Sequence, residues 1–199
     1  MKTKVKICCI SSEQEAKMAI EHGASALGLV AKMPSGPGPI ADELILSIAK
    51  TIPSHIASFM LTSETSAEDI IQHYYRTQTN TIQIVDALAF GTFDQIKKTL
   101  PAIKIVQVIH VIDESSIEEA LSIAEHVDCL LLDSGNPNAA IKELGGTGRT
   151  HNWALSKSIV EQSKVPVFLA GGLNAENVKR AIDTVGPYGV DLCSSVRTS

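Results

Sequence analysis

Two glycine-rich segments in the last third of the chain have the residue types needed to bind an anion. The first is Gly145-Gly146-Thr147-Gly148-Arg149-Thr150, and the second is Ala170-Gly171-Gly172-Leu173. Each lies between a strand-like and a helix-like segment, so its backbone amides can face a bound group. Two such turns close together indicate one phosphate held by adjacent loops, as in barrel enzymes that act on small phosphorylated metabolites.

A thiol and a carboxyl group stand near the ends of two other apolar segments. Cys8 lies in Val5–Ile10, and Asp133 ends Cys129–Asp133. A buried carboxylate is costly unless it is paired or functional, and a thiol opposite a carboxyl group can form a general base and acid pair. Strand alternation predicts that Cys8 and Cys9 point to opposite faces, so only one of them enters the site. The alternative from residue type alone is that Cys8 fills the core and Asp133 caps a turn.

The elements that must position these groups alternate regularly along the chain. Strict alternation of strands and helices implies parallel pairing. We expect an α/β fold, a single (β/α)8 TIM barrel over residues 1–199, in preference to an open doubly wound sheet. The predicted strands are Val5–Ile10, Ala26–Ala31, Ala57–Leu61, Thr81–Val85, Ile103–His110, Cys129–Asp133, Val167–Ala170 and Gly189–Leu192, and the predicted helices are 12–22, 41–50, 66–77, 92–99, 115–126, 152–163 and 174–185.

The ends of these elements carry further signals. A last helix is expected after the eighth strand, yet the sequence stops at Ser199. Either the barrel lacks this helix or the sequence is incomplete. Helix starts with N-terminal capping patterns are Ser12 with Glu15, Ser66 with Asp69, Ser115 with Glu118 and Asn174 with Asn177.

Composition excludes several classes of function. The chain has 44% hydrophobic residues and a formal net charge of -5, which argues against a general surface for nucleic acid or anionic membranes. No apolar run approaches the ~20 residues needed to span a bilayer, and the start lacks a signal-peptide apolar region. We therefore expect a cytoplasmic protein with reduced cysteines. The spacing of its cysteines and histidines matches no metal site.

Taken together, the motifs resemble those of the phosphoribosylanthranilate isomerase family over essentially the whole chain. The combination is highly specific, whereas either glycine motif alone is not. The matching segments are Lys6-Ile7-Cys8, His22-Gly23-Ala24-Ser25-Ala26-Leu27-Gly28, Leu131-Leu132-Asp133-Ser134, Gly145 to Thr150 with Trp153, Pro166 to Leu173 with Glu176-Asn177-Val178, and Pro187-Tyr188-Gly189-Val190-Asp191.

The resemblance implies an Amadori rearrangement of an N-linked ribose 5-phosphate without metal or cofactor. Asp133 corresponds to the general acid that opens the sugar ring to a Schiff base, and Cys8 to the general base that removes the C2 proton. The thiolate of Cys8 needs stabilisation, which Lys6 or the substrate iminium can provide. The product would be 1-(2-carboxyphenylamino)-1-deoxyribulose 5-phosphate, an intermediate of tryptophan biosynthesis.

The resemblance also assigns binding residues. Backbone amides of the glycine turns, with two serines after the last strand, would hold the phosphate, and Asp191 matches a carboxylate that contacts substrate. The expected partner is a small phosphorylated sugar-amine, and the protein is expected to be a monomer or a homodimer. The residues implied in phosphate binding are Gly146, Thr147, Gly148, Gly171, Gly172, Ser194 and Ser195.

Three positions depart from the family pattern. Cys9 replaces the usual glycine and is expected to be a tolerated, outward-facing thiol. The loop Gly36-Pro37-Gly38-Pro39-Ile40 lacks the arginine that faces the anthranilate carboxylate in the family, and Gln83-Ile84-Val85-Asp86 has an acid but not the usual histidine. Lys32, Arg149, Arg197 or His110 are candidates to supply the missing charge.

These departures leave three hypotheses. The first is isomerisation of N-(5-phosphoribosyl)anthranilate, and the second is the same chemistry on a related phosphoribosylamine or sugar phosphate. The third is a non-catalytic barrel that binds a phosphorylated ligand. Retention of both Cys8 and Asp133 argues against the third, because a pure binder needs no acid and base pair.

Overall fold

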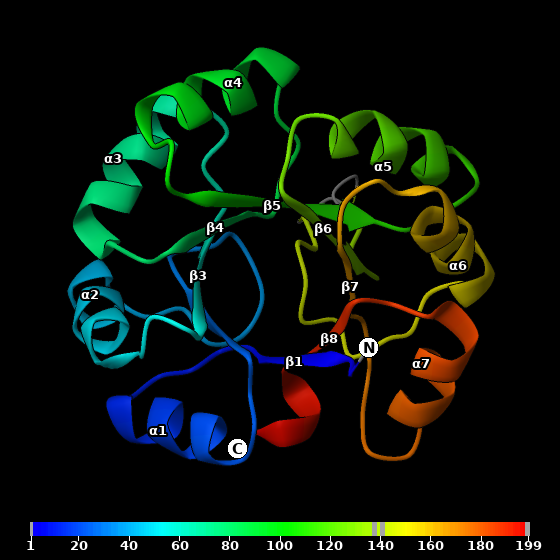
Figure 1. The fold of residues 1–199 in the computed structure, drawn as a ribbon, viewed down its shortest axis with the longest axis horizontal. Coiled ribbons are helices and arrows are strands. Elements are labelled where there is room, and N and C mark those ends of the chain that lie inside the picture. The colour runs from blue at the N-terminus through cyan, green and yellow to red at the C-terminus, as the bar shows by residue number, and fades with distance from the viewer. Residues whose placement is uncertain (1, 137–138, 140–141, 198–199) are drawn as a thin grey trace.

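The strands form a closed barrel in a computed structural model that describes residues 2–136, 139 and 142–197. Within these residues, eight parallel strands follow one another around the barrel in chain order, and β1 closes it by pairing with β8 (Figure 1). The strands are β1 (Lys4–Ile7), β2 (Ala26–Val30), β3 (Ala57–Thr62), β4 (Thr81–Ile84), β5 (Lys104–His110), β6 (Cys129–Asp133), β7 (Val167–Leu169) and β8 (Gly189–Leu192). The predicted (β/α)8 barrel is confirmed.

A ring of helices surrounds the strands, and apolar residues fill the space between the two layers. In the described chain, β8 is followed only by the short 3-10 helix η1 (Ser194–Val196). None of the helices described is long and apolar enough to cross a membrane. The helices are α1 (Glu13–Glu21), α2 (Asp42–Thr51), α3 (Ala67–Thr77), α4 (Phe90–Thr99), α5 (Ser115–Ala124), α6 (Trp153–Gln162) and α7 (Val178–Val185).

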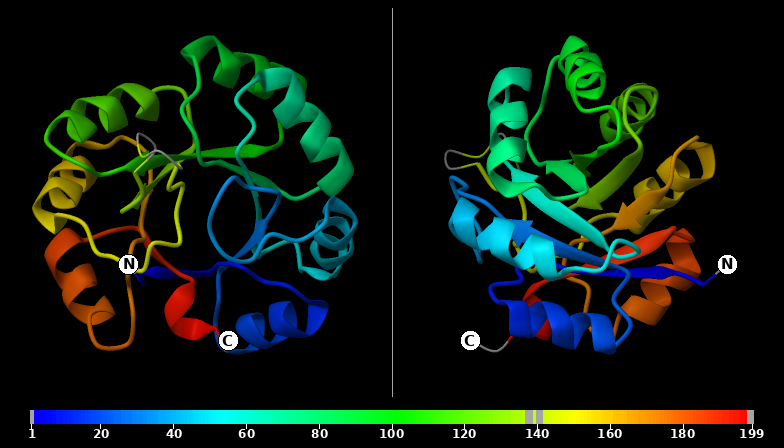
Figure 2. Two further views of the ribbon diagram at one scale, coloured as in Figure 1. Left: turned by 180° about the vertical axis from the view of Figure 1, so that it is seen from behind. Right: turned by 60° about the vertical axis from the view of Figure 1, so that its left-hand side comes forward.

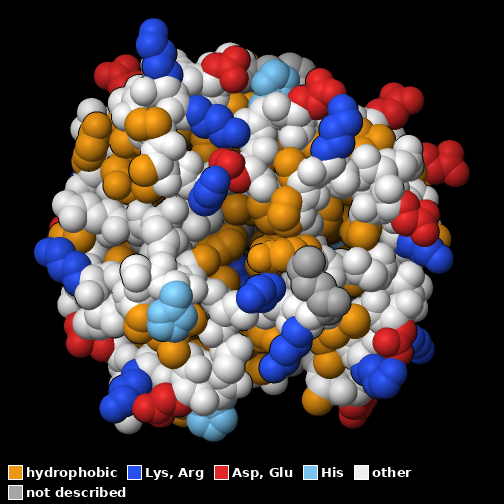
Figure 3. Space-filling model, viewed as in Figure 1, with side chains coloured by type: hydrophobic (Ala, Val, Ile, Leu, Met, Phe, Trp, Pro, Cys, Tyr) orange, Lys and Arg blue, Asp and Glu red, His pale blue; other side chains and the backbone are white. Residues whose placement is uncertain are grey.

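The two ends of the barrel differ. The N-terminus lies at one end and the C-terminus at the other (Figure 2, right). At the end where the strands begin, Phe168 packs edge-on against both Phe59 and Tyr188, and the surface there shows hydrophobic side chains with basic ones beside them (Figure 3). The carboxyl ends of the strands meet at the opposite end, where barrel enzymes have their active sites.

Two element boundaries differ from the sequence prediction by more than two residues. β1 ends at Ile7 and not at Ile10, because Cys9 has a φ of 64° and leaves the extended conformation. α7 begins at Val178, because Asn174 and Asn177 form a turn before it. In that turn the side-chain oxygen of Asn174 accepts the Asn177 amide, and that of Asn177 accepts the Asn174 amide.

The predicted caps of α1 and α3 are confirmed. Ser12 accepts the Glu15 amide, and Ser66 accepts the Asp69 amide at 3.1 Å. The cap assigned to Ser115 is wrong, because Ser115 is already the first residue of α5 and its own amide donates to the Asp113 carboxylate. Aspartate two positions upstream therefore takes the role that the capping pattern assigned to serine.

We expect Ser66→Ala to lower the free energy of unfolding by about 1 kcal/mol, because the Asp69 amide loses its acceptor. The measurement is the urea midpoint at an unchanged denaturant slope. Ser115→Ala is the matched control, since the Ser115 hydroxyl donates to Asp113 and caps no helix amide in the described structure. Equal losses in the two variants would contradict this assignment.

Candidate active site

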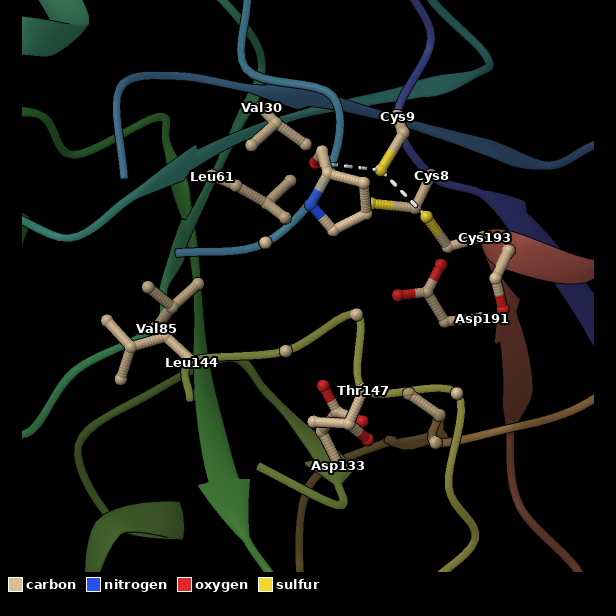
Figure 4. Close-up of a pocket in the computed structure, with 18 of the residues that line it drawn as sticks. Cys8, Cys9, Val30, Leu61, Val85, Asp133, Leu144, Thr147, Asp191 and Cys193 are labelled. Atoms are coloured by element: carbon tan, nitrogen blue, oxygen red, sulfur yellow. Dashed lines mark hydrogen bonds between the residues drawn. The ribbon is translucent and has the colours of Figure 1, made fainter. Parts of the chain in front are cut away.

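A cavity opens at the carboxyl ends of the strands, with about 720 Å³ of space between its walls when the part open to solvent is counted. The loops after β1, β2, β6, β7 and β8 supply most of its wall (Figure 4). Among the residues proposed from the sequence, those that line the cavity are Cys8, Asp133, Gly146, Thr147, Gly148, Gly171, Gly172, Asp191 and Ser194. Lys6 and Ser195 do not line the cavity.

Cys8 is held at the end of β1 by a close approach of two strands. Its amide donates to the Leu192 carbonyl at 2.8 Å, and its side chain is buried. A Cβ atom built on Gly28 of β2 would lie 2.7 Å from the Cys8 sulfur and 3.2 Å from the Lys6 Nζ. Only glycine at this position leaves room for both side chains. Gly28 ends the family-like segment His22 to Gly28, in which no local pattern indicates this role.

Cys9 does not point away from the site, which corrects the expectation from strand alternation. Because its φ is 64°, the residue leaves the strand geometry, and both Cys8 and Cys9 line the cavity. The Cys9 sulfur lies 2.7 Å from that of Cys193, to which no role was assigned from the sequence. Three thiols therefore meet at this edge of the cavity (Figure 4).

Asp133 lies on the opposite wall from Cys8 (Figure 4). It ends β6, and one carboxylate oxygen accepts the Ser134 amide at 2.7 Å. The other oxygen faces the glycine turn, 2.9 Å from where a Cβ on Gly145 would lie. Asp133 is 8% exposed, so this second oxygen is available to a bound molecule within a largely dry site.

Lys6 and Asp191 form a buried ion pair beneath Cys8. The Nζ atom lies 2.8 Å from an Asp191 oxygen, and Lys6 is fully buried. Burial alone would lower the pKa of Lys6, but the Asp191 carboxylate and the nearby thiols outweigh it, so that pKa lies above its usual value. Burial raises the pKa of Asp191 to about 7 despite Lys6, with Cys8 and Asp133 adding to the rise. Lys6 therefore stays charged while Asp191 titrates near neutral pH.

The two glycine-rich turns contact each other directly. A Cβ atom on Gly172 would lie 2.7 Å from the Arg149 carbonyl carbon and 2.8 Å from the Gly148 oxygen. Gly146, Gly148, Gly171 and Gly172 all have positive φ values between 59° and 81°. Across the turns, the hydroxyls of Ser134 and Thr147 lie 2.7 Å apart. The prediction that two adjacent loops meet at one place is confirmed.

Several backbone amides of these turns have no hydrogen-bond acceptor in the described part of the chain. Among the hydrogen bonds that the structure describes, none is donated by the amides of Gly146, Thr147, Gly148, Gly171 or Gly172. Ser194 lines the cavity beside them. Ser195 does not, because its hydroxyl donates to the Leu173 carbonyl at 2.7 Å and ties η1 to the turn after β7.

The proline-rich loop after β2 reaches across the cavity and contacts the loop after β6. A Cβ on Gly146 would lie 2.4 Å from the Pro37 ring, and one on Gly36 would lie 3.6 Å from the Gly145 oxygen. The Ser35 hydroxyl donates to the Lys142 carbonyl, which joins the two loops. The loop after β2 is therefore part of the wall itself.

Asp86 has a cation partner that the sequence analysis did not consider. Its carboxylate pairs with the Lys142 Nζ, and the residue is 8% exposed. The candidates named from the sequence are placed otherwise. Arg149 pairs with Glu143, Lys32 is exposed, and Arg197 reaches toward Gly38. His110 is buried, with its Nε2 3.0 Å from the Val85 carbonyl oxygen, which makes it a structural residue.

Residues 5–199 match the family model described as N-(5'phosphoribosyl)anthranilate (PRA) isomerase. A relative from Methanosarcina mazei, N-(5'-phosphoribosyl)anthranilate isomerase 2, is 34% identical over 98% of this chain and 86% of its own. The chain belongs to the N-(5'-phosphoribosyl)anthranilate isomerase family.

Solved structures of the family have the same fold. Phosphoribosyl anthranilate isomerase from Thermotoga maritima superposes with a TM-score of 0.84 at 29% identity, over all of this chain and 91% of its own. Another member, solved with reduced 1-(o-carboxyphenylamino)-1-deoxyribulose 5-phosphate, has a TM-score of 0.81 at 27% identity, over 100% and 90% of the two chains. A further structure concerns monomers made from the dimeric Thermotoga maritima enzyme.

Within this family site, we expect Gly28→Ala to displace the Cys8 sulfur and lower kcat by roughly 10²-fold, the cost of misplacing a reacting group by about 1 Å. Initial rates on folded protein, checked by circular dichroism, provide the measurement. Gly91→Ala is the control, because a Cβ there meets nothing within 4 Å. The assignment fails if Gly28→Ala is as active as the Gly91→Ala variant.

Proposed function

We propose that the cavity binds N-(5'-phosphoribosyl)anthranilate and converts it to 1-(2-carboxyphenylamino)-1-deoxyribulose 5-phosphate, with Asp133 as general acid and Cys8 as general base. The chain has the isomerase activity of its family, in tryptophan biosynthesis. The residue roles are supported by one observation: Cys8 and Asp133 line the same cavity from opposite walls, beside the two glycine turns.

The first step is opening of the sugar ring. The carboxyl group of Asp133 donates a proton to the ring oxygen of the ribose, and the bond from that oxygen to C1 breaks. The anthranilate nitrogen supplies the electrons, so the product is a protonated Schiff base. Because Asp133 is 8% exposed, little water competes with the ring oxygen for its proton.

The second step is removal of the C2 proton by Cys8. The hydrogen bond with Cys193 and burial raise the pKa of the Cys8 thiol above its usual value, although the Cys9 thiol and Lys6 oppose them. The positive Schiff base lowers that pKa once the ring has opened, because a nearby opposite charge favours the thiolate. The base therefore becomes active after the acid has acted. Loss of the C2 proton gives an enolamine, which takes up a proton at C1 to form the amino-ketose.

Unpaired groups in the wall match the polar groups of such a substrate. The free amides of the glycine turns suit the phosphate oxygens, which accept hydrogen bonds from backbone N–H groups. Two side-chain oxygens, Asp191 Oδ1 and Gln83 Oε1, are buried with no partner among the described residues. Both belong to residues that line the cavity, where each can accept a hydroxyl or amine proton of the sugar.

The roles of Cys8 and Asp133 are tested by following the anthranilate fluorescence as the substrate turns over. Wild-type protein should be active, and Cys8→Ala and Asp133→Asn should each lose roughly 10²–10⁴-fold in kcat, the usual contribution of one acid or base. Cys129→Ala is the control, since Cys129 starts β6 at the other end of the barrel. Wild-type activity in either site variant refutes the assigned role.

Lys142 is proposed to offset the negative charge that the anthranilate carboxylate brings. The described residues that line the cavity include Asp133 and Asp191 but neither lysine nor arginine. Asp86 directly follows Val85 of the wall, so without Lys142 its carboxylate would repel the substrate. Asp86 stands beside the position at which the family usually has a histidine, which is Val85 in this chain.

We expect Lys142→Ala to raise KM about tenfold, equivalent to about 1.4 kcal/mol. The double variant Asp86→Asn/Lys142→Ala should recover most of that loss, because it removes the unpaired acid as well. Lys164→Ala serves as a control, since Lys164 is an exposed residue paired with Glu125. An unchanged KM in Lys142→Ala removes this residue from the binding site.

A further inference from the structure

Two thiols at the edge of the cavity have no part in the acid–base mechanism. The sulfurs of Cys9 and Cys193 lie 2.7 Å apart, closer than van der Waals contact between two sulfur atoms. They come from the two ends of the chain, 184 residues apart. A contact this close between distant residues must be built by the fold.

The barrel seam builds it. β1 and β8 are neighbours, with Ile7 paired to Leu192, so the chain leaves both strands side by side. Continued by one residue, this register places Cys8 opposite Cys193, and Cys9 one residue further on. The spacing of adjacent strands, about 4.7–4.9 Å, falls within the Cα separation of about 4.4–6.8 Å that a disulfide requires. The positive φ of Cys9 then turns its side chain toward Cys193.

The surroundings confine the Cys9 sulfur from the other side. It lies 3.5 Å from the Pro37 carbonyl oxygen, and a Cβ on Gly38 would lie 2.7 Å from the Cys9 Cβ. Figure 4 shows Cys9 and Cys193 pointing toward each other, while the Cys8 sulfur points into the cavity. The contact between Cys9 and Cys193 is therefore already formed in the reduced protein.

We propose that Cys9 and Cys193 form a reversible dithiol–disulfide pair, which a peroxide entering the cavity oxidises while Cys8 stays a free thiol. The thiolate of Cys193 attacks one oxygen of hydrogen peroxide and the O–O bond breaks, which leaves a sulfenic acid. The departing hydroxide takes up the proton that the Cys193 thiol released, and this forms one water. The Cys9 thiol then attacks the Cys193 sulfur, and the hydroxyl leaves with a proton as a second water. Two thiols and one peroxide thus give one disulfide and two waters.

The Cys9 and Cys193 thiols differ in pKa and in exposure, as this order of reaction steps requires. Hydrogen bonds from the Cys8 and Cys9 thiols lower the pKa of Cys193 to about 4, and Arg197 adds to the effect. The hydrogen bonds of Cys9 with Cys193 and Cys8, together with burial, raise the pKa of Cys9 above its usual value. Cys193 is also the more exposed of the two. A thiolate that can be reached attacks first, and the neighbouring thiol resolves the sulfenic acid.

The pair would protect the catalytic thiol. An oxidant that reaches the cavity meets a thiolate at Cys193, whereas the Cys8 thiol is protonated until substrate is bound and its ring has opened. Because only the thiolate is a strong nucleophile, Cys193 reacts before Cys8. The protection of activity rests on the proposed role of Cys8, but formation of the disulfide does not.

The test is thiol mapping after oxidation. Reduced full-length protein is treated with hydrogen peroxide, alkylated, digested and analysed by mass spectrometry. We expect a mass lower by two hydrogen atoms, a cross-linked peptide pair containing Cys9 and Cys193, alkylated Cys8 and Cys129, and reversal by dithiothreitol. Four alkylated cysteines, or a cross-link that includes Cys8, would overturn the proposal.

Variants separate the pair from the catalytic thiol. Cys9→Gly suits the positive φ, and Cys9→Ser keeps the size of the side chain. In both, peroxide should leave a sulfenic acid on Cys193 that dimedone captures, and isomerase activity should fall faster on oxidation than in wild type. Cys129→Ser should behave like wild type, because the Cys129 thiol is buried away from the pair and burial raises its pKa to about 12. Equal sensitivity of all variants to peroxide would contradict the protective role, whatever the unoxidised activity.

Discussion

The buried ion pair between Lys6 and Asp191 is the interaction on which the site depends. The two residues face each other in the register of β1 and β8, the strands that close the barrel. The Lys6 ammonium also lies 5.2 Å from the centre of the Phe59 ring on β3. Lys6 therefore links its own strand, β1, to β8 and β3. A charge can remain in such a core only because it is paired, and the pairing fixes the register of the seam. Cys8 and Cys193 each lie two residues beyond this ion pair, so the same register places them side by side.

Close approach of main chains is the second constraint, and it explains why glycine stands at two positions. Gly28 leaves room for the Cys8 sulfur and the Lys6 ammonium, and Gly172 lets the turn after β7 touch the turn after β6. Any side chain at either place would separate the elements that it joins. Glycine there brings Cys8, Asp133 and the backbone amides of the two turns to the wall of one cavity.

The sequence predicts the fold well and the site in part. Apolar periodicity located every strand. The two motifs that contain Cys8 and Asp133 pointed to residues that share a cavity. Local patterns failed where a non-local contact decides the geometry. Cys9 leaves strand alternation because its backbone is in the left-handed region, and its contact with Cys193 depends on barrel closure. Lys142 carries no motif, and its pairing with Asp86 joins residues 56 positions apart.

Electrostatics explain how an acidic chain can accept an anionic substrate. The chain has a formal net charge of -5, and the described cavity wall has carboxylates at Asp133 and Asp191. The pKa of Asp191 near 7 leaves this carboxyl group partly neutral at physiological pH. Lys6 stays charged because its own pKa is raised, so the pair carries partial positive charge. That charge lies beneath Cys8, where it favours the thiolate. The burial that makes the ion pair costly is therefore also what prepares the site for its substrate.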